Sequence, residues 1–311
     1  MRQSFEMNKL APVVLFVYNR PIHTEKVILS LLENDLIKDT DLFVYSDGPK
    51  NHEQSLKVQK VRQLVHSFSG FKSITIIEST KNKGLSRSII DGVTHVIDQY
   101  GKAIILEDDC VVSPFFLYYM NQALIFYDKN LNVGSISGYC PPINIPLHYN
   151  QDVILIPRIC SWAWATWIDK WKTIDWLCSD FIVKNLNLHF ARKFNQCGDD
   201  MFSRLCRELR VGAKSWATRF AYSHFTQGYS TIYPIYSYIY NIGQDGSGEH
   251  KKSSTFMNND LHKSIQFPQL ENVMIKPYFV KQFRKIYSGR MIGSIKRYCI
   301  AIYDIYFRMK K

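Results

Sequence analysis

The chain has 311 residues, of which 46% are hydrophobic and 21% are charged. This composition excludes a disordered or fibrous protein, and a chain of this length can bury a large core without disulfides or a structural metal. The formal net charge at pH 7 is +12, which favours an anionic partner: nucleic acid, a phospholipid surface or a phosphorylated small molecule.

The positive charge is concentrated in the C-terminal residues. Residues 276–311 hold ten Lys or Arg and one acid, Asp304, a net charge of +9. The first 275 residues hold 29 basic and 26 acidic side chains, so their net charge is only +3. Because a nucleic-acid enzyme needs basic residues around its catalytic part, we expect no nucleic-acid partner.

The seven cysteines form no CxxC pair and no Cys/His spacing typical of a metal site. Their odd number and scattered positions favour reduced thiols in a cytosolic protein. The first residues lack the apolar region of a signal peptide, and no apolar stretch approaches 18 residues. We therefore expect a protein that is cytoplasmic and spans no membrane.

The first part of the chain alternates predicted strands with predicted helices. Apolar β-branched or aromatic runs predict strands at 13–18, 42–46, 74–78 and 103–106, and helical patterns lie at 24–32, 52–68 and 86–99. Alternation with short connections predicts a parallel, doubly wound α/β sheet. Such sheets bind ligands outside the carboxyl ends of their strands.

Polar side chains follow each of these four strands. They are Asn19 and Arg20, Asp47, Asn82, and the triplet Glu107-Asp108-Asp109. Three neighbouring carboxylates repel one another, which raises at least one pKa unless a cation is bound. Mg²⁺ or Mn²⁺ held by carboxylate and diphosphate oxygens relieves that repulsion. The alternative is a solvated loop with an Asp that caps the next helix.

The second part of the chain has a different pattern. A strand is predicted at 134–138, a Pro-rich loop at 141–146, a helix from about 200 to 209 and a strand at 213–218. Five tryptophans lie within 162–176. Core packing is the usual role for aromatic residues at this spacing, whereas indole faces also stack on sugars. The glycine-rich segment 243–248 is either a lid over a ligand or an ordinary mobile loop.

The segment Ile104-Ile105-Leu106-Glu107-Asp108-Asp109, followed by Val111-Val112-Ser113-Pro114-Phe115-Phe116, resembles the signature of GT-A glycosyltransferases. It is most similar to the N-acetylglucosaminyltransferase I type, which has a Glu-Asp-Asp form of the DXD motif. Tyr18-Asn19-Arg20, Ser46-Asp47, the aromatic segment Trp162–Trp171 and Asp199-Asp200 follow the same order. The resemblance covers roughly residues 11–235. It implies a Rossmann-like, mostly parallel sheet flanked by helices and followed by a C-terminal basic helical appendage.

The resemblance also implies a donor site for a nucleotide-diphospho sugar, with a UDP-sugar as the expected donor. Asp109 matches the residue that reaches a Mn²⁺ or Mg²⁺ ion on the diphosphate, Asp108 lies near the ribose, and Glu107 faces the donor sugar. Arg20 and Asp47 match nucleotide contacts. Chemically, Arg20 suits a diphosphate or a base carbonyl, and Asp47 suits the N3–H of a uracil.

Further positions follow from the same resemblance. Arg87, in the loop after residue 82, is expected to touch phosphate, and a late histidine, His224, is a weaker candidate metal ligand. An inverting transfer needs a carboxylate base near the acceptor hydroxyl. Asp200 is the preferred base and Asp199 its partner; the alternative is that both acids only begin a helix. Trp162 and Trp164 are the expected acceptor platform.

The C-terminal segment combines its cations with apolar residues three and four apart, among them Phe279 and Phe283. This pattern predicts amphipathic helices on an anionic membrane surface, with a helix packed on the catalytic domain as the alternative. The expected domains are a catalytic unit at 1–255, with a donor half at 11–112 and an acceptor half at 113–255, and a membrane-associating segment at 256–311.

The sequence thus predicts a metal-dependent, inverting glycosyltransferase (a hexosyltransferase). Its expected acceptor is a glycan or lipid-linked glycan in surface polysaccharide assembly, as for capsule or lipopolysaccharide. The enzyme would lie peripherally at the inner face of the membrane. The alternatives are a catalytically silent nucleotide-sugar or carbohydrate-binding protein of the same fold and a metal-dependent nucleic-acid enzyme.

Overall fold

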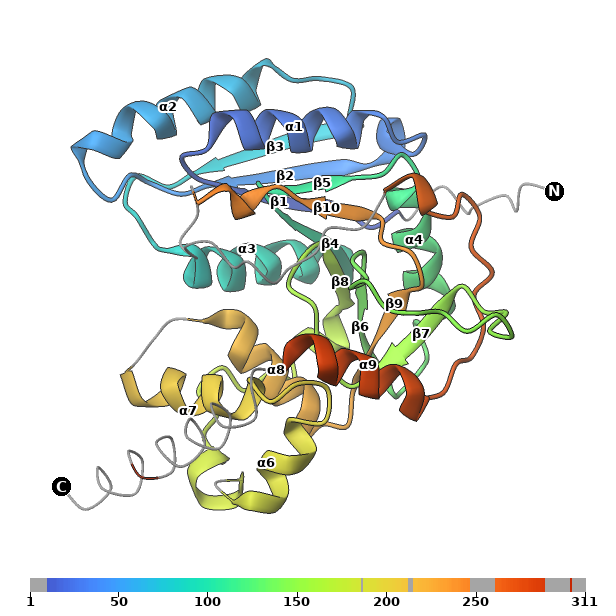
Figure 1. The fold of residues 1–311 in the computed structure, drawn as a ribbon. Coiled ribbons are helices and arrows are strands. Elements are labelled where there is room, and N and C mark those ends of the chain that lie inside the picture. The colour runs from blue at the N-terminus through green and yellow to red at the C-terminus, as the bar shows by residue number, and fades with distance from the viewer. Residues whose placement is uncertain (1–9, 186, 212–214, 247–260, 289–302, 304–311) are drawn as a thin grey trace.

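The computed structural model describes residues 10–185, 187–211, 215–246, 261–288 and 303. An eight-stranded sheet with strand order β3-β2-β1-β4-β8-β6-β9-β7 runs through the molecule (Figure 1). Four neighbouring strand pairs are parallel and three are antiparallel. The predicted class is confirmed: an α/β protein with a mostly parallel central sheet flanked by helices.

The predicted elements of the first part are all present. The strands are β1 (Val13–Val17), β2 (Asp41–Ser46), β3 (Ser73–Glu78) and β4 (Lys102–Glu107), and the helices are α1 (Pro21–Leu32), α2 (His52–Ser67) and α3 (Leu85–Tyr100), with a short 3₁₀ turn, η2 (Ile37–Asp39). These four strands are mutually parallel, so their carboxyl ends lie at one edge of the sheet. Local signals explain the boundaries: Pro21 suits a first helical position, and the Asn51 side chain caps α2 by accepting from the backbone N–H of Gln54.

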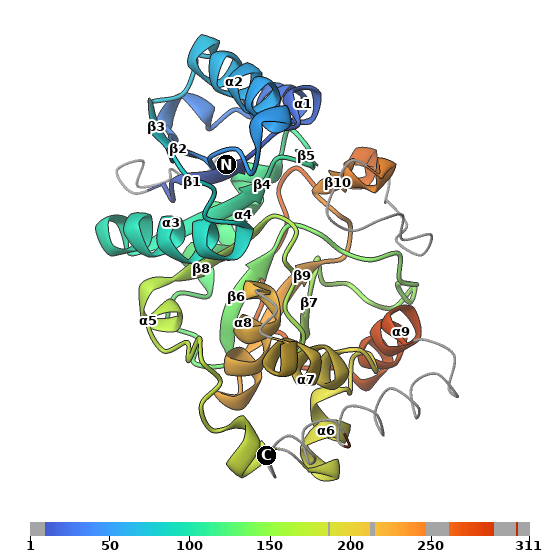
Figure 2. The same cartoon turned by 90° about the vertical axis from the view of Figure 1, so that its left-hand side faces the viewer.

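Alternate residues of β1 enter two different cores. Val13 and Leu15 pack with α1 and α2, whereas Val14 and Phe16 pack with α3 and Trp164. Figure 2 shows α1 and α2 on one side of these strands and α3 on the other. A strand covered on both faces must be apolar throughout, which is why the run 13–17 is continuous rather than alternating.

The second part contributes shorter elements. They are β5 (Cys110–Val112), α4 (Phe116–Phe126), β6 (Val133–Ser137), β7 (Val153–Ile156), β8 (Trp164–Trp167), α5 (Ile168–Trp171), the π-helical turn η3 (Phe181–Asn185), α6 (Leu188–Phe194), α7 (Met201–Val211), α8 (Trp216–Thr226), β9 (Ser230–Pro234), β10 (Ile239–Asn241), η4 (Gly243–Asp245), η5 (Leu261–Lys263) and α9 (Pro277–Tyr287). The predicted strand at 134–138 is β6, and the predicted helix at 200–209 is α7.

One predicted element is wrong. The described part of the stretch 213–218 begins at Ser215, which caps helix α8 by accepting from the backbone N–H of Thr218. A short apolar run is ambiguous between strand and helix, and here the cap and the packing of α8 on the sheet favour the helix. Residues 212–214 lie outside the described residues.

The C-terminal segment packs on the sheet through α9. Phe279 and Phe283 are 1% and 0% exposed and lie in a core with Ile154 and Ile156 of β7. Their expected role as membrane-facing residues is therefore wrong, because the protein interior already buries them. Residues 289–302 and 304–311 lie outside the described residues, so membrane association of that part stays a prediction. Among the described residues no helix is both long and apolar enough to cross a membrane.

Candidate functional site

The parallel arrangement of β1 and β4 brings an arginine onto two acids. Phe16 of β1 lies in register with Glu107, the last residue of β4. Beyond the strand ends, Arg20 donates a hydrogen bond from Nη2 to Oδ1 of Asp108, and the same nitrogen lies 3.1 Å from Oδ2 of Asp109. Residues predicted from two separate strand endings thus meet, and we call this cluster the acid pair and its arginine.

Burial determines the charges at this point. Asp108 is only 4% exposed. Burial, together with the smaller effect of the neighbouring Asp109 charge, raises its pKa to about 6 against the attraction of Arg20. Burial by itself would lower the pKa of Arg20, but the two carboxylates raise it, so the guanidinium keeps its charge. Oδ2 of Asp108 is buried and has no hydrogen-bond partner among the described residues.

A second strand pair holds Asp109 from the other side. β10 pairs antiparallel with β5, which places Asn241 opposite Cys110. The Asn241 amide donates to Oδ1 of Asp109 at 3.2 Å, and the backbone N–H of Ile242 donates to the Asp109 carbonyl at 2.8 Å. A Cβ at Gly243 would lie 2.3 Å from Oδ2 of Asp109. A larger residue there would have to displace the Asp109 carboxylate, so the start of the glycine-rich segment lies against the acid pair.

The sequence alone did not indicate three of these neighbours: His23, Asn241 and Asp245. His23 Nε2 lies 3.2 Å from Oδ2 of Asp245, which joins the first turn of α1 to η4. The only sequence signal for this contact was the glycine content of 243–248, because nothing local relates residue 23 to residue 245. Residues 247 and 248 of that segment lie outside the described residues.

The acid pair suits a cation whose other ligands come from a substrate and water. Among the described residues no group of three or more His, Cys, Asp or Glu could hold a metal by itself. Asp108 and Asp109 nonetheless offer hard carboxylate oxygens, one of which, Oδ2 of Asp108, is unpartnered. Mg²⁺ is commonly bound by one or two carboxylates together with substrate phosphates and waters, so the donor set fits such an ion. Glu107 is partly exposed beside them.

Asp47 has a different role from the one expected. Its carboxylate accepts hydrogen bonds from the backbone N–H groups of Gly48, Lys83 and Gly84 and from the Asn82 amide, at 2.8 to 3.0 Å. Four protein donors saturate both oxygens, so no acceptor remains for a uracil N3–H. Asp47 instead fixes the loop before α3 at the carboxyl edge of the sheet.

Arg87 lies on the exposed surface of α3. Its side chain is 70% exposed, and its Nε lies 2.9 Å from Oδ2 of Asp91 one turn later. An exposed pair of this kind contributes little to stability. This contact is directed to Asp91 and not to the acid pair, so the contact of Arg87 with a donor phosphate stays a prediction.

Asp200 is engaged by two arginines. Arg158 forms a bidentate pair with it, Nη1 to Oδ1 at 2.9 Å and Nη2 to Oδ2 at 3.0 Å, and Arg204 Nε lies 3.0 Å from Oδ2. Burial would raise the pKa of Asp200, but Arg158 and then Arg204 hold it below its usual range. A general base needs an available oxygen and a pKa near the working pH. The geometry therefore contradicts Asp200 as base, whereas Asp199 is half-exposed and remains a candidate.

Helix α9 covers the Arg158–Asp200 pair. The Tyr287 ring of α9 lies 3.9 Å from the Arg158 guanidinium carbon. Gly198 has φ of +147°, and a Cβ there would lie 2.6 Å from Tyr287, 2.8 Å from Arg158 and 2.9 Å from Asp200. The glycine therefore permits the chain to approach this cluster, which joins β7, α7 and α9.

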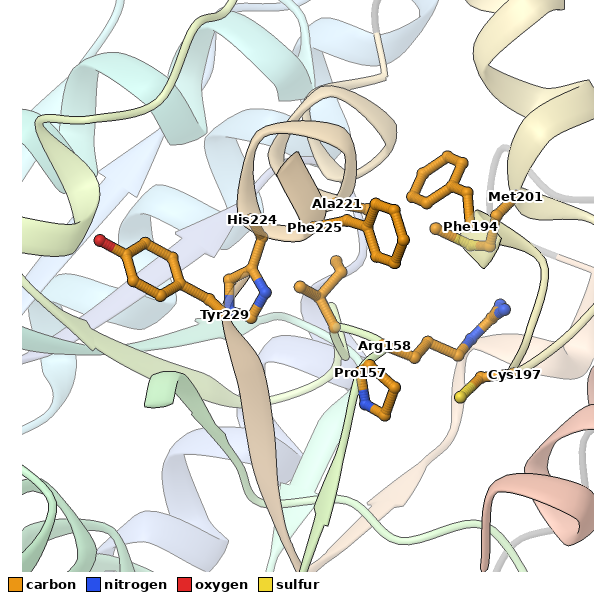
Figure 3. A pocket seen from close by; sticks show the side chains of 10 residues that line it. Pro157, Arg158, Phe194, Cys197, Met201, Ala221, His224, Phe225 and Tyr229 are labelled. Carbon is orange, nitrogen blue, oxygen red and sulfur yellow. The ribbon is translucent and has the colours of Figure 1, made fainter. Parts of the chain in front are cut away.

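His224 is a core residue rather than a metal ligand. It lies within α8, is 3% exposed and has Nε2 3.2 Å from the Ser135 hydroxyl. Burial lowers its pKa to about 3, so the imidazole is neutral. Figure 3 shows it lining a hollow with Arg158 and Phe225. The hollow offers about 10 Å³ to the centre of a water, room for about one water molecule and for no sugar.

The two candidate acceptor tryptophans differ in burial. Trp164 is 1% exposed and its ring stacks on Trp216, with centroids 5.1 Å apart. It is a core residue, so its expected role as an acceptor platform is wrong. Trp162 is half-buried and lies edge to face with Tyr139 at 4.8 Å. Only Trp162 keeps surface that a sugar can reach, and its role stays a prediction.

Neither a known family model nor a curated protein sequence matches the chain. Among solved structures it is similar to residues 1–349 of S. aureus TarS, with 11% identity and a TM-score of 0.40 over 74% of this chain and 60% of that one. A longer TarS chain has 12% identity and a TM-score of 0.40 over 76% of this chain and 37% of that one. The mannosyltransferase PcManGT from Pyrobaculum calidifontis, in complex with GDP-Man and Mn²⁺, has 12% identity and a TM-score of 0.39 over 71% of this chain and 72% of that one. The chain spans 60% of the first of these, and identities and TM-scores this low establish no family for it.

Proposed function

We propose that this protein is a metal-dependent glycosyltransferase of the GT-A type. Its proposed donor is a nucleotide-diphospho sugar, namely a UDP-sugar. The observation that supports this is the acid pair and its arginine at the carboxyl ends of the adjacent parallel strands β1 and β4. That edge is where α/β sheets bind ligands. A guanidinium beside two carboxylates supplies one group for a phosphate and two for a cation.

Each residue at the edge has a role in this proposal. Asp109 and Asp108 would hold Mn²⁺ or Mg²⁺, which supplies positive charge to the leaving diphosphate when bound. Arg20 binds a diphosphate oxygen, and Glu107 faces the donor sugar. Asn241 orients Asp109 through the 3.2 Å hydrogen bond. Such positioning reduces the entropic cost of bringing the reactants together.

The acceptor side rests on fewer contacts. For an inverting transfer, we propose Asp199, the partly exposed acid next to Asp200, as the carboxylate that takes the proton from the acceptor hydroxyl. Trp162 offers an aromatic face for a sugar. We propose a glycan or lipid-linked glycan acceptor in surface polysaccharide assembly, reached from a peripheral position on the membrane through the basic residues after 288.

A second function is favoured by one observation. The carboxylate expected to be the base, Asp200, is held by two guanidiniums, which is compatible with a catalytically silent protein that only binds nucleotide sugars. The two proposals agree on donor binding and differ on turnover.

The deciding experiment measures UDP release from a panel of UDP-sugars with Mn²⁺ and candidate glycan acceptors. The wild type should turn over, and Asp109→Ala should not. Asp128→Ala, which removes an exposed carboxylate in the turn after α4, is the matched control and should retain activity. Metal-dependent donor binding without release supports the silent protein. Absence of both binding and release contradicts the whole proposal.

A further inference from the structure

The position of Arg20 in the structure bears on how a metal ion enters the site. Its Nη2 contacts Oδ1 of Asp108 and Oδ2 of Asp109, one oxygen from each acid. All three side chains are largely buried, at 15%, 5% and 16% exposed. Since a cation shared by the two acids would lie between these same side chains, the guanidinium charge stands close to where such a cation would bind.

The arginine satisfies the acid pair only in part. One guanidinium charge against two carboxylates leaves a net charge of about −1 when both acids are ionised. Oδ2 of Asp108 has no hydrogen-bond partner among the described residues, although it is buried. An unpartnered buried oxygen is costly, and the cost is removed when a cation arrives. The acid pair therefore has room for more positive charge than Arg20 provides.

Other charges around the pair do not replace the arginine. The imidazole of His23 lies 3.2 Å from the Asp245 carboxylate. Asn241 is neutral and occupies Oδ1 of Asp109. Among the described contacts to the two acids, Arg20 supplies the positive charge.

We propose that Arg20 is an internal counter-ion that competes with the divalent metal for Asp108 and Asp109 and is released when the donor diphosphate binds. This inference rests on the proposed function for the identity of the donor. A diphosphate offers the guanidinium the same planar oxygen geometry as a carboxylate, so it can accept Arg20 as the metal displaces it. Metal and donor then bind cooperatively, and each raises the affinity of the protein for the other by the same factor.

The competition predicts a change in metal affinity opposite to the one expected when a residue that supports a metal site is removed. Removing a positively charged residue from between two acids should tighten metal binding in the absence of nucleotide. The same change should weaken the dependence of metal binding on the nucleotide, because no counter-ion remains to be released. A residue that merely stabilises the loop has neither effect.

The test is a titration of the full chain with Mn²⁺ alone. The electron paramagnetic resonance signal of the free ion measures how much Mn²⁺ stays unbound. Arg20→Gln should bind Mn²⁺ roughly tenfold more tightly than the wild type, a size typical of coupling between sites. Arg192→Gln removes an exposed positive charge on α6, remote from the acid pair, and should match the wild type. Equal affinity of Arg20→Gln and wild type overturns the proposal, as does tighter binding by both variants.

A second arm adds UDP. The wild type should bind Mn²⁺ more tightly with UDP than without it, and Arg20→Gln should show a smaller increase. An equal increase in both proteins overturns the proposal. If Arg20→Gln does not fold, Arg20→Met decides, because it also removes the competing charge and should give a similar rise in Mn²⁺ affinity. No rise in a folded Met variant overturns the proposal.

These outcomes separate the inference from the proposed function. Tighter Mn²⁺ binding by Arg20→Gln, without sugar transfer by the wild type, supports the counter-ion and contradicts the transferase. Transfer by the wild type with unchanged Mn²⁺ affinity in Arg20→Gln does the reverse.

Discussion

Two acid–arginine clusters in this protein share their chemistry and differ in how completely they are satisfied. In the Arg158–Asp200 cluster both carboxylate oxygens are paired, a second arginine is added and Tyr287 covers the guanidinium. In the cluster of Arg20 with Asp108 and Asp109, one buried oxygen has no described partner. A closed cluster holds segments together, whereas an incomplete one is able to accept a ligand. Motif matching does not distinguish them; the hydrogen-bond partners do.

The largest effect should come from the incomplete cluster. Asp109→Asn keeps the size of the side chain and the contact to Asn241 but removes the charge, so we expect turnover to fall by about 10²-fold or more. The free energy of unfolding should change little, because the carboxylates of this cluster are not fully paired in the folded protein. Assays of UDP release and urea unfolding on the same protein check both statements. A large loss of stability with normal turnover would reverse the assignment of the two clusters.

The closed cluster should show the opposite pattern. Asp200→Ala leaves Arg158 buried without its bidentate partner, which should lower the free energy of unfolding by about 3–5 kcal/mol. Asp180→Ala is not a clean control, because it removes both the largely exposed ion pair with Lys184 and the hydrogen bond that the Tyr222 hydroxyl donates to Asp180. Asp91→Ala, facing the exposed Arg87, is the cleaner control and should cost less than 1 kcal/mol. Equal costs for Asp200→Ala and Asp91→Ala would contradict a closed cluster.

His224 lies beside the closed cluster and should make stability depend on pH. Its folded pKa of about 3 is below the ordinary 6.5, so the unfolded chain binds more protons between these values. The stabilisation is complete above pH 6.5 and is lost as pH falls toward 3. At 1.36 kcal/mol per pKa unit, about 2 kcal/mol should be lost between pH 7 and 5. Urea unfolding at both pH values should show a smaller loss in His224→Gln, and an identical loss would contradict the neutral imidazole.

The smallest expected effect concerns Tyr287, whose ring covers the Arg158 guanidinium in the closed cluster. Tyr287→Leu keeps apolar volume over Arg158 but removes the aromatic face, so the free energy of unfolding should fall by about 1–2 kcal/mol. Chemical unfolding of the full chain measures it, with Tyr303→Leu, at an exposed position, as the reference. If both substitutions cost the same, the aromatic face of Tyr287 contributes no more to stability than an exposed tyrosine ring does.

The sequence predicted much of the fold because its signals are local. The runs 13–17 and 103–106 are apolar on every residue, as strands buried on both faces require, and the polar residues after each run mark the ligand-binding edge. Arg20, Asp108 and Asp109 could therefore be expected to meet. The stretch after 213 was misassigned because a short apolar run does not distinguish a strand from the helix that Ser215 begins.

The remaining site errors arise from partners that are distant in the chain. The sequence predicts Asp47 as a nucleotide contact, but in the structure the loop at 82–84 supplies three of its four hydrogen-bond donors. It predicts Trp164 as a sugar platform, but Trp216 stacks on that ring. Neither partner can be inferred from spacing, because a side chain is satisfied by whatever packs against it in three dimensions.

By itself, the sequence determined the order of strands and helices in the first part of the chain and the edge of the sheet at which its acids gather. Periodicity and strand endings are properties of neighbouring residues, so they are visible without a structure. Only the tertiary structure decided which acids are closed and which keep an unpartnered oxygen. That difference depends on Arg158 lying 42 residues from Asp200 and on Asn241 lying 132 residues from Asp109, distances along the chain that only folding removes.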